Sequence, residues 1–336
     1  MNPIALQKLR IWMNERGFER FFVQNPENFA WLSGGGDNTV VVNRPAAWLE
    51  VAGDASTPVR LHTSRIEAQR LTEEEVEGLE VISHPWYSPP NLPSPNDSEH
   101  DLTLLRLVLG PEEQERYRAL GRDAARAIGE VMQDAEPEWT EFELAGAVAS
   151  ALYAYGIQPV VLLAAGEERI FTYRHPLPKN RPLGRLAMAV LCGRRAGLIA
   201  NVTRIKTWGH SQARALMDRV LQVESAALSC TVPGKTLAEV FLTLKQAYTD
   251  IGYPEAIEEH HQGGLTGYKP REMLATPSNL TILETAMAVA WNPSLRGAKV
   301  EDTFLIGENG LENLTLDPHW PMVKVEGRLR PGLLEG

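Results

Sequence analysis

"LAMAVLCGRRAGLIANVTRI", residues 186–205, contains two strand-like stretches, LAMAVLC (186–192) and GLIANVTRI (197–205). Only the short segment GRRA separates them, so the sequence predicts a β-hairpin with its turn near Arg195. In a hairpin centred there, the numbers of facing residues sum to 391, which pairs Val190 with Asn201. Facing residues have Cβ atoms about 5 Å apart, close enough to share a ligand.

Amphipathic helices alternate with strands in the rest of the chain. Pro111 stands at a helix start with acidic residues in the first turn. Thr140 with Glu143, and Thr236 with Glu239, have the spacing of capping boxes ahead of apolar runs. Two further strand-like stretches are AMAVAWN (286–292) and VEDTFLIG (300–307). Strands interleaved with long helices predict an α+β protein, with helices on one side of a sheet.

The chain is long enough for two domains. Residues 1–100 show alternating helix and strand patterns, and HPWYSPPNLPSPNDSEHD (84–101) contains five prolines. That proline content prevents a helix and indicates a linker or a long surface loop. The 336 residues are therefore predicted to form an N-terminal domain over 1–108 and a C-terminal domain over 109–336.

Composition limits the classes of function. The formal net charge is −10, which argues against nucleic-acid and anionic-membrane binding, because both require clustered Lys and Arg. Cys192 and Cys230 are the two cysteines, and their spacing fits neither a disulfide scaffold nor a thiolate zinc site. The N-terminus lacks an apolar signal core, and no apolar run reaches membrane-spanning length. A cytoplasmic protein is expected.

Five landmarks occur in a recognisable order. They are RHPLP (174–178), a GLIANVTR stretch similar to a Gly-Tyr-x-Ser-Asp-x-Thr-Arg motif, HQGGL (261–265), AWNP (290–293) and KVEDTFLIG (299–307). With them, the C-terminal two-thirds resembles the pita-bread fold of creatinase, prolidase, Xaa-Pro aminopeptidase and methionine aminopeptidase. The N-terminal part resembles the smaller creatinase-type domain that precedes it in that family.

The resemblance implies a dinuclear metal site with Asp, Asp, His, Glu and Glu as ligands. Residue by residue, these positions correspond to Val190, Asn201, His261, Asn292 and Glu301. Three of the four carboxylates are missing, and two dications need several anionic oxygens. No Asp occurs between residues 137 and 217, so an alignment shift cannot restore the missing pair. We therefore expect a degenerate metal site and no cofactor.

The same resemblance suggests which side chains line the old cleft. His175, His261 and Glu301 are the candidate catalytic residues, although a lone histidine is more often structural and Glu301 with Asp302 could be an ordinary charged strand edge. Arg271 could attract an anionic ligand such as a peptide C-terminus. The candidate binding residues are Arg174, Asn201, Tyr268, Arg271, Trp291 and Asn292. His260 is expected to be exposed or structural.

Three functional hypotheses remain open. The first is a non-catalytic relative of the peptidases that binds a peptide, a small amide or another protein. The second is a metal-free hydrolase, as in creatinase, with His175 as the acid–base. The third is an Xaa-Pro metallopeptidase with atypical ligands. By resemblance to two-domain relatives, a two-fold symmetric homodimer is expected.

Overall fold

The computed structural model of the protein describes residues 1–42 and 44–336. The chain divides into two compact units. Unit 1 comprises Met1–Glu113 with Ala196–Leu198, and unit 2 comprises Gln114–Arg195 with Ile199–Gly336. The predicted boundary between residues 108 and 109 lies a few residues before this division.

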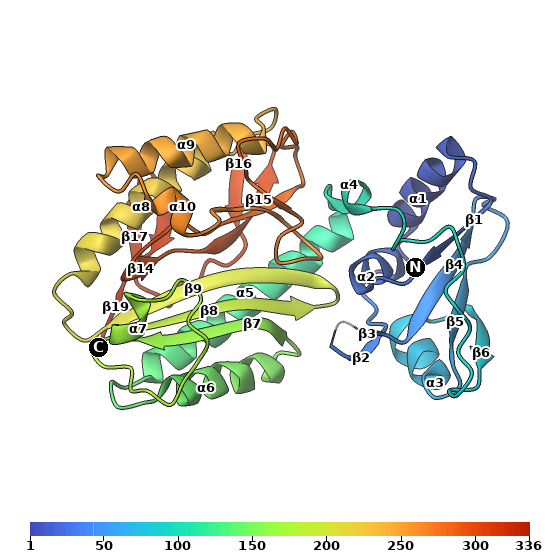
Figure 1. The fold of residues 1–336 in the computed structure, drawn as a ribbon, viewed down its shortest axis with the longest axis horizontal. Helices are drawn as coiled ribbons and strands as arrows, with labels where there is room; N and C mark the ends of the chain where they lie inside the picture. Colours follow the sequence, from blue (N-terminus) through green and yellow to red (C-terminus); the bar gives the residue numbers. More distant parts are fainter. Residues whose placement is uncertain (43) are drawn as a thin grey trace. The chain divides into compact units, whose positions relative to one another are not determined.

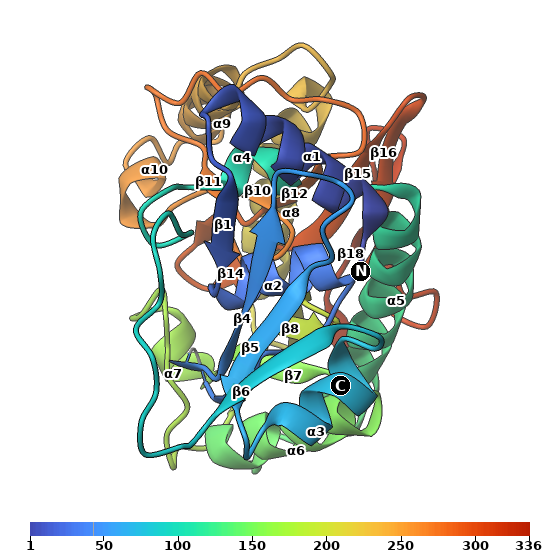
Figure 2. The ribbon, with the colours of Figure 1, turned by 90° about the vertical axis from the view of Figure 1, so that its right-hand side faces the viewer.

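Unit 1 is built on a four-stranded sheet with the order β1-β4-β5-β6, in which only β5 and β6 are parallel (Figure 2). Its strands are β1 (Arg20–Val23), β4 (Ala47–Ala52), β5 (Arg60–Ser64) and β6 (Glu80–His84), with a separate pair β2 (Thr39–Val41) and β3 (Arg44–Pro45). Its helices are α1 (Pro3–Glu15), α2 (Pro26–Ser33), α3 (Ala68–Arg70), the π-helical turn η1 (Leu71–Glu75) and α4 (Thr103–Arg106).

Three helices, α5, α6 and α9, begin at the predicted signals. Pro111 is the first residue of α5, and both capping boxes are present, Thr140 with Glu143 and Thr236 with Glu239. The helices are α5 (Pro111–Asp134), α6 (Glu141–Ala154), α7 (Glu167–Ile170), α8 (Ala213–Cys230), α9 (Leu237–Asp250) and α10 (Ala256–Glu259).

Two larger sheets form the frame of unit 2, with the orders β19-β9-β8-β7 and β11-β10-β12-β15-β16. The four-stranded sheet contains β7 (Gln158–Gly166), β8 (Leu186–Arg195), β9 (Leu198–Thr207) and β19 (Leu334–Glu335). The five-stranded sheet contains β10 (Gly263–Thr266), β11 (Met273–Leu274), β12 (Ala288–Trp291), β15 (Asp302–Gly307) and β16 (Gly310–Asn313). Two short pairs are β13 (Ser294–Leu295) with β14 (Ala298–Lys299), and β17 (Met322–Val325) with β18 (Arg328–Pro331).

Helices cover both sheets of unit 2. Figure 1 shows α5 and α6 beside β7, β8 and β9, and α8 and α9 beside the C-terminal strands. The Tyr117 hydroxyl of α5 donates to the Ile199 carbonyl of β9 at 2.6 Å, which fixes the helix against the strand. The mixture of sheets and covering helices confirms the α+β prediction.

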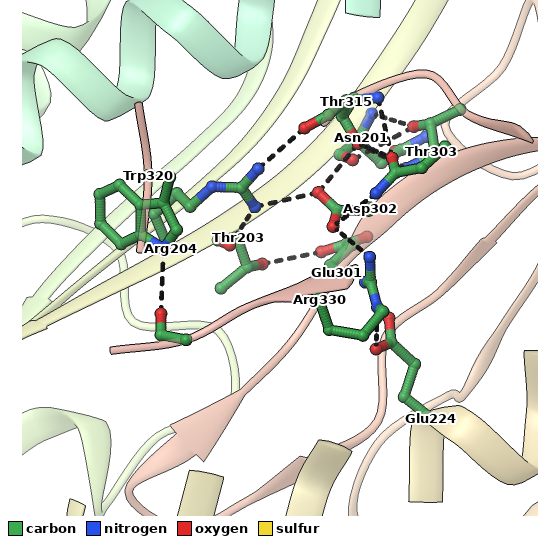
Figure 3. Close-up of polar contacts among 12 residues, drawn as sticks. Asn201, Thr203, Arg204, Glu224, Glu301, Asp302, Thr303, Thr315, Trp320 and Arg330 are labelled. Carbon is green, nitrogen blue, oxygen red and sulfur yellow. Dashed lines mark hydrogen bonds and ion pairs between the residues drawn. The ribbon is translucent and has the colours of Figure 1, made fainter. Parts of the chain in front are cut away.

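The two sheets meet where β9 approaches the start of β15. The Thr203 amide donates to the Glu301 carbonyl at 2.9 Å, and the two residues form an isolated antiparallel bridge. Next to it, the Asn201 amide donates to the Thr303 hydroxyl at 2.8 Å (Figure 3). This junction brings two of the predicted site positions, Asn201 and Glu301, into one buried region.

Candidate functional site

The β8–β9 hairpin is present, but its register differs from the prediction. A two-residue turn at Ala196 and Gly197 joins the strands, and both residues have positive φ, 48° and 78°. Positive φ at both central positions is the requirement of a type I′ turn. At the open end of the hairpin, the Trp208 amide donates to the Arg185 carbonyl at 2.9 Å.

Both ends of the hairpin therefore pair residues whose numbers sum to 393. The predicted pairing of Val190 with Asn201 is wrong, because the turn lies one residue later than Arg195. Asn201 faces Cys192, and Val190 lies diagonally from Asn201 on the same face of the sheet, at about 7–8 Å. Val190 is buried and, being apolar, offers no ligand atom.

Glu301 is held by two cationic side chains and a hydroxyl. One carboxylate oxygen accepts a hydrogen bond from Arg271 Nη2 at 2.6 Å. The other oxygen lies 3.0 Å from Lys299 Nζ and accepts from Thr203 Oγ1 at 3.1 Å. The Glu301 and Lys299 side chains are only 2% and 6% exposed, so these pairs are shielded from water. Charge-assisted bonds of this kind fix the carboxylate in one orientation.

The surroundings of Glu301 lower its pKa. Burial acts in the opposite direction and is the largest single influence, but Lys299 and then Arg271 outweigh it and hold the Glu301 pKa at about 2. The side chain is therefore a carboxylate at neutral pH.

Arg271 also connects Glu301 to Asn201. Its Nη1 donates to Asn201 Oδ1 at 3.0 Å, while Asn201 Nδ2 donates to Thr266 Oγ1 at 2.9 Å. One guanidinium thus bridges the side-chain oxygens of two positions that the family resemblance assigns to metal ligands. Of Glu301, Arg271 and Lys299, two are positive and one is negative, so the group carries one net positive charge.

Three histidines form a second group. His175 lies in the loop between α7 and β8, and His260 and His261 lie between α10 and β10. His260 Nε2 is 2.9 Å from His175 Nε2, and the ring centroids of His260 and His261 are 4.4 Å apart. His260 Nδ1 is hydrogen-bonded to the His261 carbonyl oxygen. The prediction that His260 is merely exposed or structural did not anticipate this cluster, in which His260 is buried.

The histidine rings are neutral at physiological pH. Burial lowers the pKa of His260 to about 3, assisted by Lys299 and His261, and burial with Arg271 lowers that of His261 to about 4. The pKa of His175 is also lowered, first by burial and then by Lys299. Glu301 opposes this effect at His175 and His261, so its carboxylate is within electrostatic range of both rings. The structure thus brings the three candidate catalytic residues into one neighbourhood.

The other candidate binding residues are placed differently. Trp291 is fully buried, its indole donates to Thr231 Oγ1 at 2.9 Å, and its backbone pairs with Asp302, the residue after Glu301. Arg174 pairs with Glu259, and Tyr268 is buried with its hydroxyl 3.4 Å from Arg116 Nη2.

Asn292 is buried at 2% exposure. Its backbone amide donates to the Gln262 carbonyl at 3.1 Å. Its Oδ1 accepts no hydrogen bond from the residues that the structure describes. A buried acceptor in this state costs about 1–3 kcal/mol and can accept a hydrogen bond from a ligand.

A buried ionic network supports the junction from the other side of Glu301 (Figure 3). Asp302 lies 2.9 Å from Arg204 Nη1 and 2.8 Å from Arg330 Nη1. Arg330 in turn makes a bidentate pair with Glu224 at 2.5 and 2.7 Å. All four side chains are almost fully buried, so removing any one of them would leave an uncompensated buried charge. By fixing Asp302, the network fixes the backbone that carries Glu301.

Residues 115–308 match metallopeptidase family M24. The chain belongs to this family. An Xaa-Pro dipeptidase of Pyrococcus furiosus is 22% identical over 338 residues, covering 92% of this chain and 97% of the relative. An uncharacterized peptidase of Staphylococcus saprophyticus is 28% identical over 123 residues, about a third of the length of each protein.

Solved structures with low sequence identity share the M24 architecture. A prolidase from Pyrococcus furiosus matches with a TM-score of 0.76 at 19% identity, covering 92% of this chain and 100% of that one. An X-Pro aminopeptidase from Thermotoga maritima also gives 0.76, at 16% identity and 98% and 99% coverage. The N-terminal domain of a FACT complex subunit from Cicer arietinum gives 0.66 at 13% identity, with 93% and 96% coverage. The predicted two-domain pita-bread fold is confirmed.

Among the described residues, no helix combines the length and apolarity needed to cross a membrane. The sequence suggested His175, His261 and Glu301 as candidate residues but not Lys299. A signal was available, because Lys299 stands two residues before Glu301, and alternate residues of an extended segment point to one side.

Proposed function

We propose that this M24 protein has lost the dinuclear metal site and binds a peptide or a small amide without hydrolysing it. The observation that carries the proposal is that two side-chain cations contact the oxygens that would have to bind a metal. Arg271 and Lys299 engage both oxygens of Glu301, and Arg271 also engages the side-chain oxygen of Asn201.

The residues present do not fit a pair of divalent metals. Val190 offers no donor atom, and Asn201 and Asn292 offer only neutral amide oxygens. A dication about 4 Å from a guanidinium would be repelled by roughly 8 kcal/mol at an effective dielectric constant of 20. Since Glu301 supplies a single negative charge, binding of a metal pair at these ligand positions would require both cations to move away.

The chemistry of the group favours a ligand that combines an amide with a carboxylate. Its net positive charge attracts an anion, such as the C-terminus of a short peptide. Asn292 Oδ1, buried and without a hydrogen bond from the described residues, supports binding of an N–H donor. The neutral His175 and His261 add donors and acceptors that do not require a charged partner.

Two assays test this proposal. Xaa-Pro dipeptides are incubated with the full chain in the presence of Mn²⁺ or Co²⁺, and no cleavage is expected. Binding to an immobilised array of short peptides with free C-termini is then measured, and Arg271→Ala is expected to reduce it at least tenfold. Metal-dependent cleavage would refute the loss of the site, and the absence of binding across the array would refute the binding role. The cleavage assay equally decides the hypothesis of a metallopeptidase with atypical ligands.

A metal-free hydrolase is the second candidate. It is favoured by His175, an exposed neutral imidazole whose Nε2 is hydrogen-bonded to His260 and therefore suited to proton transfer. Turnover of small amides or guanidino compounds without added metal, abolished by His175→Ala, would establish it. A cytoplasmic location is part of the proposal and rests on the sparse cysteines.

A further inference from the structure

The histidine cluster, defined as His175, His260 and His261, brings three ring nitrogens together, and the proposed function does not use this convergence. One ring nitrogen from each histidine can be chosen so that all three lie within 4.8 Å of one another. Zinc–imidazole bonds are about 2.0–2.1 Å long, so ligand atoms around one ion lie about 3–4 Å apart. The three rings therefore need only small side-chain adjustments to share one ion.

His260 is already oriented as a metal ligand. Its Nδ1 is hydrogen-bonded to the backbone carbonyl oxygen of His261, which places the proton on Nδ1 because a carbonyl can only accept. The lone pair of Nε2 is then directed toward His175 Nε2, 2.9 Å away. A backbone carbonyl on the remote ring nitrogen is the usual way in which proteins orient a ligating histidine.

Access to the cluster is open on one side. His260 is buried, whereas His175 and His261 are exposed. An ion can therefore enter from solvent, and three protein ligands leave a further coordination position for water or an anion.

We propose that His175, His260 and His261 bind one divalent transition-metal ion, with Zn²⁺ as the representative of the class. This site shares only His261 with the dinuclear set that the family resemblance implies, and its other two ligands come from outside that set. It replaces the expectation that the protein has no metal cofactor. The proposal goes beyond the peptide-binding role, to which His175 and His261 contribute only hydrogen-bonding groups.

The ligand type and the local charge select the kind of metal. Imidazole suits Zn²⁺, Cu²⁺ and Ni²⁺, whereas Mg²⁺, Ca²⁺ and Mn²⁺ prefer carboxylate, carbonyl and water oxygens. The cluster contains no carboxylate, and the nearby Lys299 and Arg271 disfavour ions that are held by charge alone. An anion such as hydroxide or chloride at the open position offsets part of this repulsion.

The test is a Zn²⁺ titration of the untagged, chelator-treated full chain, in competition with a chromophoric chelator. One equivalent is expected to bind the wild type. His175→Ala and His260→Ala are each expected to weaken binding at least about 100-fold, more than loss of an outer-shell partner does. His319→Ala is the matched control, since His319 is an exposed histidine of unit 2 outside the cluster, and it should leave the affinity unchanged.

Co²⁺ provides a second readout, because a tetrahedral imidazole site gives an intense visible spectrum that a hexa-aqua ion lacks. Absence of saturable Zn²⁺ binding would overturn the proposal, as would binding that survives both substitutions or Mn²⁺ binding of equal strength. If His260→Ala does not fold, the exposed His175→Ala decides the question. Mn²⁺-dependent Xaa-Pro cleavage without Zn²⁺ binding at the cluster would refute the proposed function and this inference by separate measurements.

Discussion

Replacing Arg271 by Met tests whether the cations around Glu301 stabilise the fold. Met keeps most of the side-chain volume but removes the guanidinium, so Glu301, 2% exposed, would retain only Lys299 and Thr203 as partners. Breaking one partner from a buried ion pair leaves charge that neither water nor protein compensates.

The pKa of Glu301 gives the magnitude. It lies about 2.5 below the ordinary value of 4.5, and each pH unit corresponds to about 1.4 kcal/mol, so ionised Glu301 contributes roughly 3 kcal/mol at neutral pH. Breaking a buried pair costs about 3–5 kcal/mol, and the retained Lys299 places Arg271→Met near the lower limit, at about 3 kcal/mol. Arg126→Met is the control, because the exposed pair of Arg126 with Glu130 contributes less than about 1 kcal/mol.

Urea unfolding at pH 7, followed by circular dichroism, measures both variants. Adding Glu301→Gln to Arg271→Met should not restore the lost free energy of unfolding, because Lys299, 6% exposed, then loses its anionic partner. Equal costs of Arg271→Met and Arg126→Met would show that Arg271 does not stabilise ionised Glu301.

The pH dependence of the free energy of unfolding independently tests whether ionised Glu301 stabilises the fold. Because the folded pKa of Glu301 is below the unfolded one, its contribution is complete above about pH 5 and is lost as the pH falls from 4.5 toward 2. Removing Arg271 raises the folded pKa toward the unfolded value, so the pH-dependent contribution of Glu301 should become smaller and its loss should be confined to a higher pH range. An unchanged acid profile would contradict the assignment of Arg271 as a partner of Glu301.

Three further outcomes are expected. Val190→Asp with Asn201→Asp and Asn292→Glu should bind no Mn²⁺ by elemental analysis unless Arg271 and Lys299 are also replaced by Ala; binding by the triple variant alone would show that the cations do not block the site. Light scattering at micromolar concentration should give twice the mass of the 37.3 kDa chain, and a monomer would disprove the homodimer that the family resemblance predicts. Cys192 should resist a thiol reagent in the native state, because burial, assisted by Glu301, raises its pKa to about 12; rapid labelling of the folded protein would count against this.

Local signals predicted the framework of unit 2 because each acts over a few residues. The capping boxes at Thr140 and Thr236 need only a side chain three positions away, and both form as predicted. The hairpin register could not be read in the same way. It depends on which residues take positive φ, and Ala196 does so although alanine rarely adopts that conformation.

The sequence could suggest candidate site residues, but it could not show that Arg271 and Lys299 pair with Glu301. His175, His261 and Glu301 follow from landmark positions in the chain. Arg271 and Lys299 reach Glu301 through long side chains. The direction of each side chain is set by tertiary packing: Arg271 lies thirty residues before Glu301 in the chain, and Lys299 lies at the end of the short strand β14. Arg271 was accordingly expected to meet a ligand carboxylate, whereas its partner is a carboxylate of the protein itself.

If the proposed function is correct, the loss of the metal-binding carboxylates and the presence of Arg271 and Lys299 are coupled, because neither change would be tolerated without the other. If the carboxylates had been lost without Arg271 and Lys299, Glu301 would be a buried charge with only a hydroxyl partner, at a cost of several kcal/mol. If the cations had been gained with all four carboxylates present, they would compete with metal for the same oxygens. Restoring one acidic ligand therefore does not return metal binding, since a single added carboxylate only offsets the net positive charge of the group around Glu301. Recovery of the dinuclear site requires both sets of changes together, which separates this chain from a peptidase that lacks a single ligand.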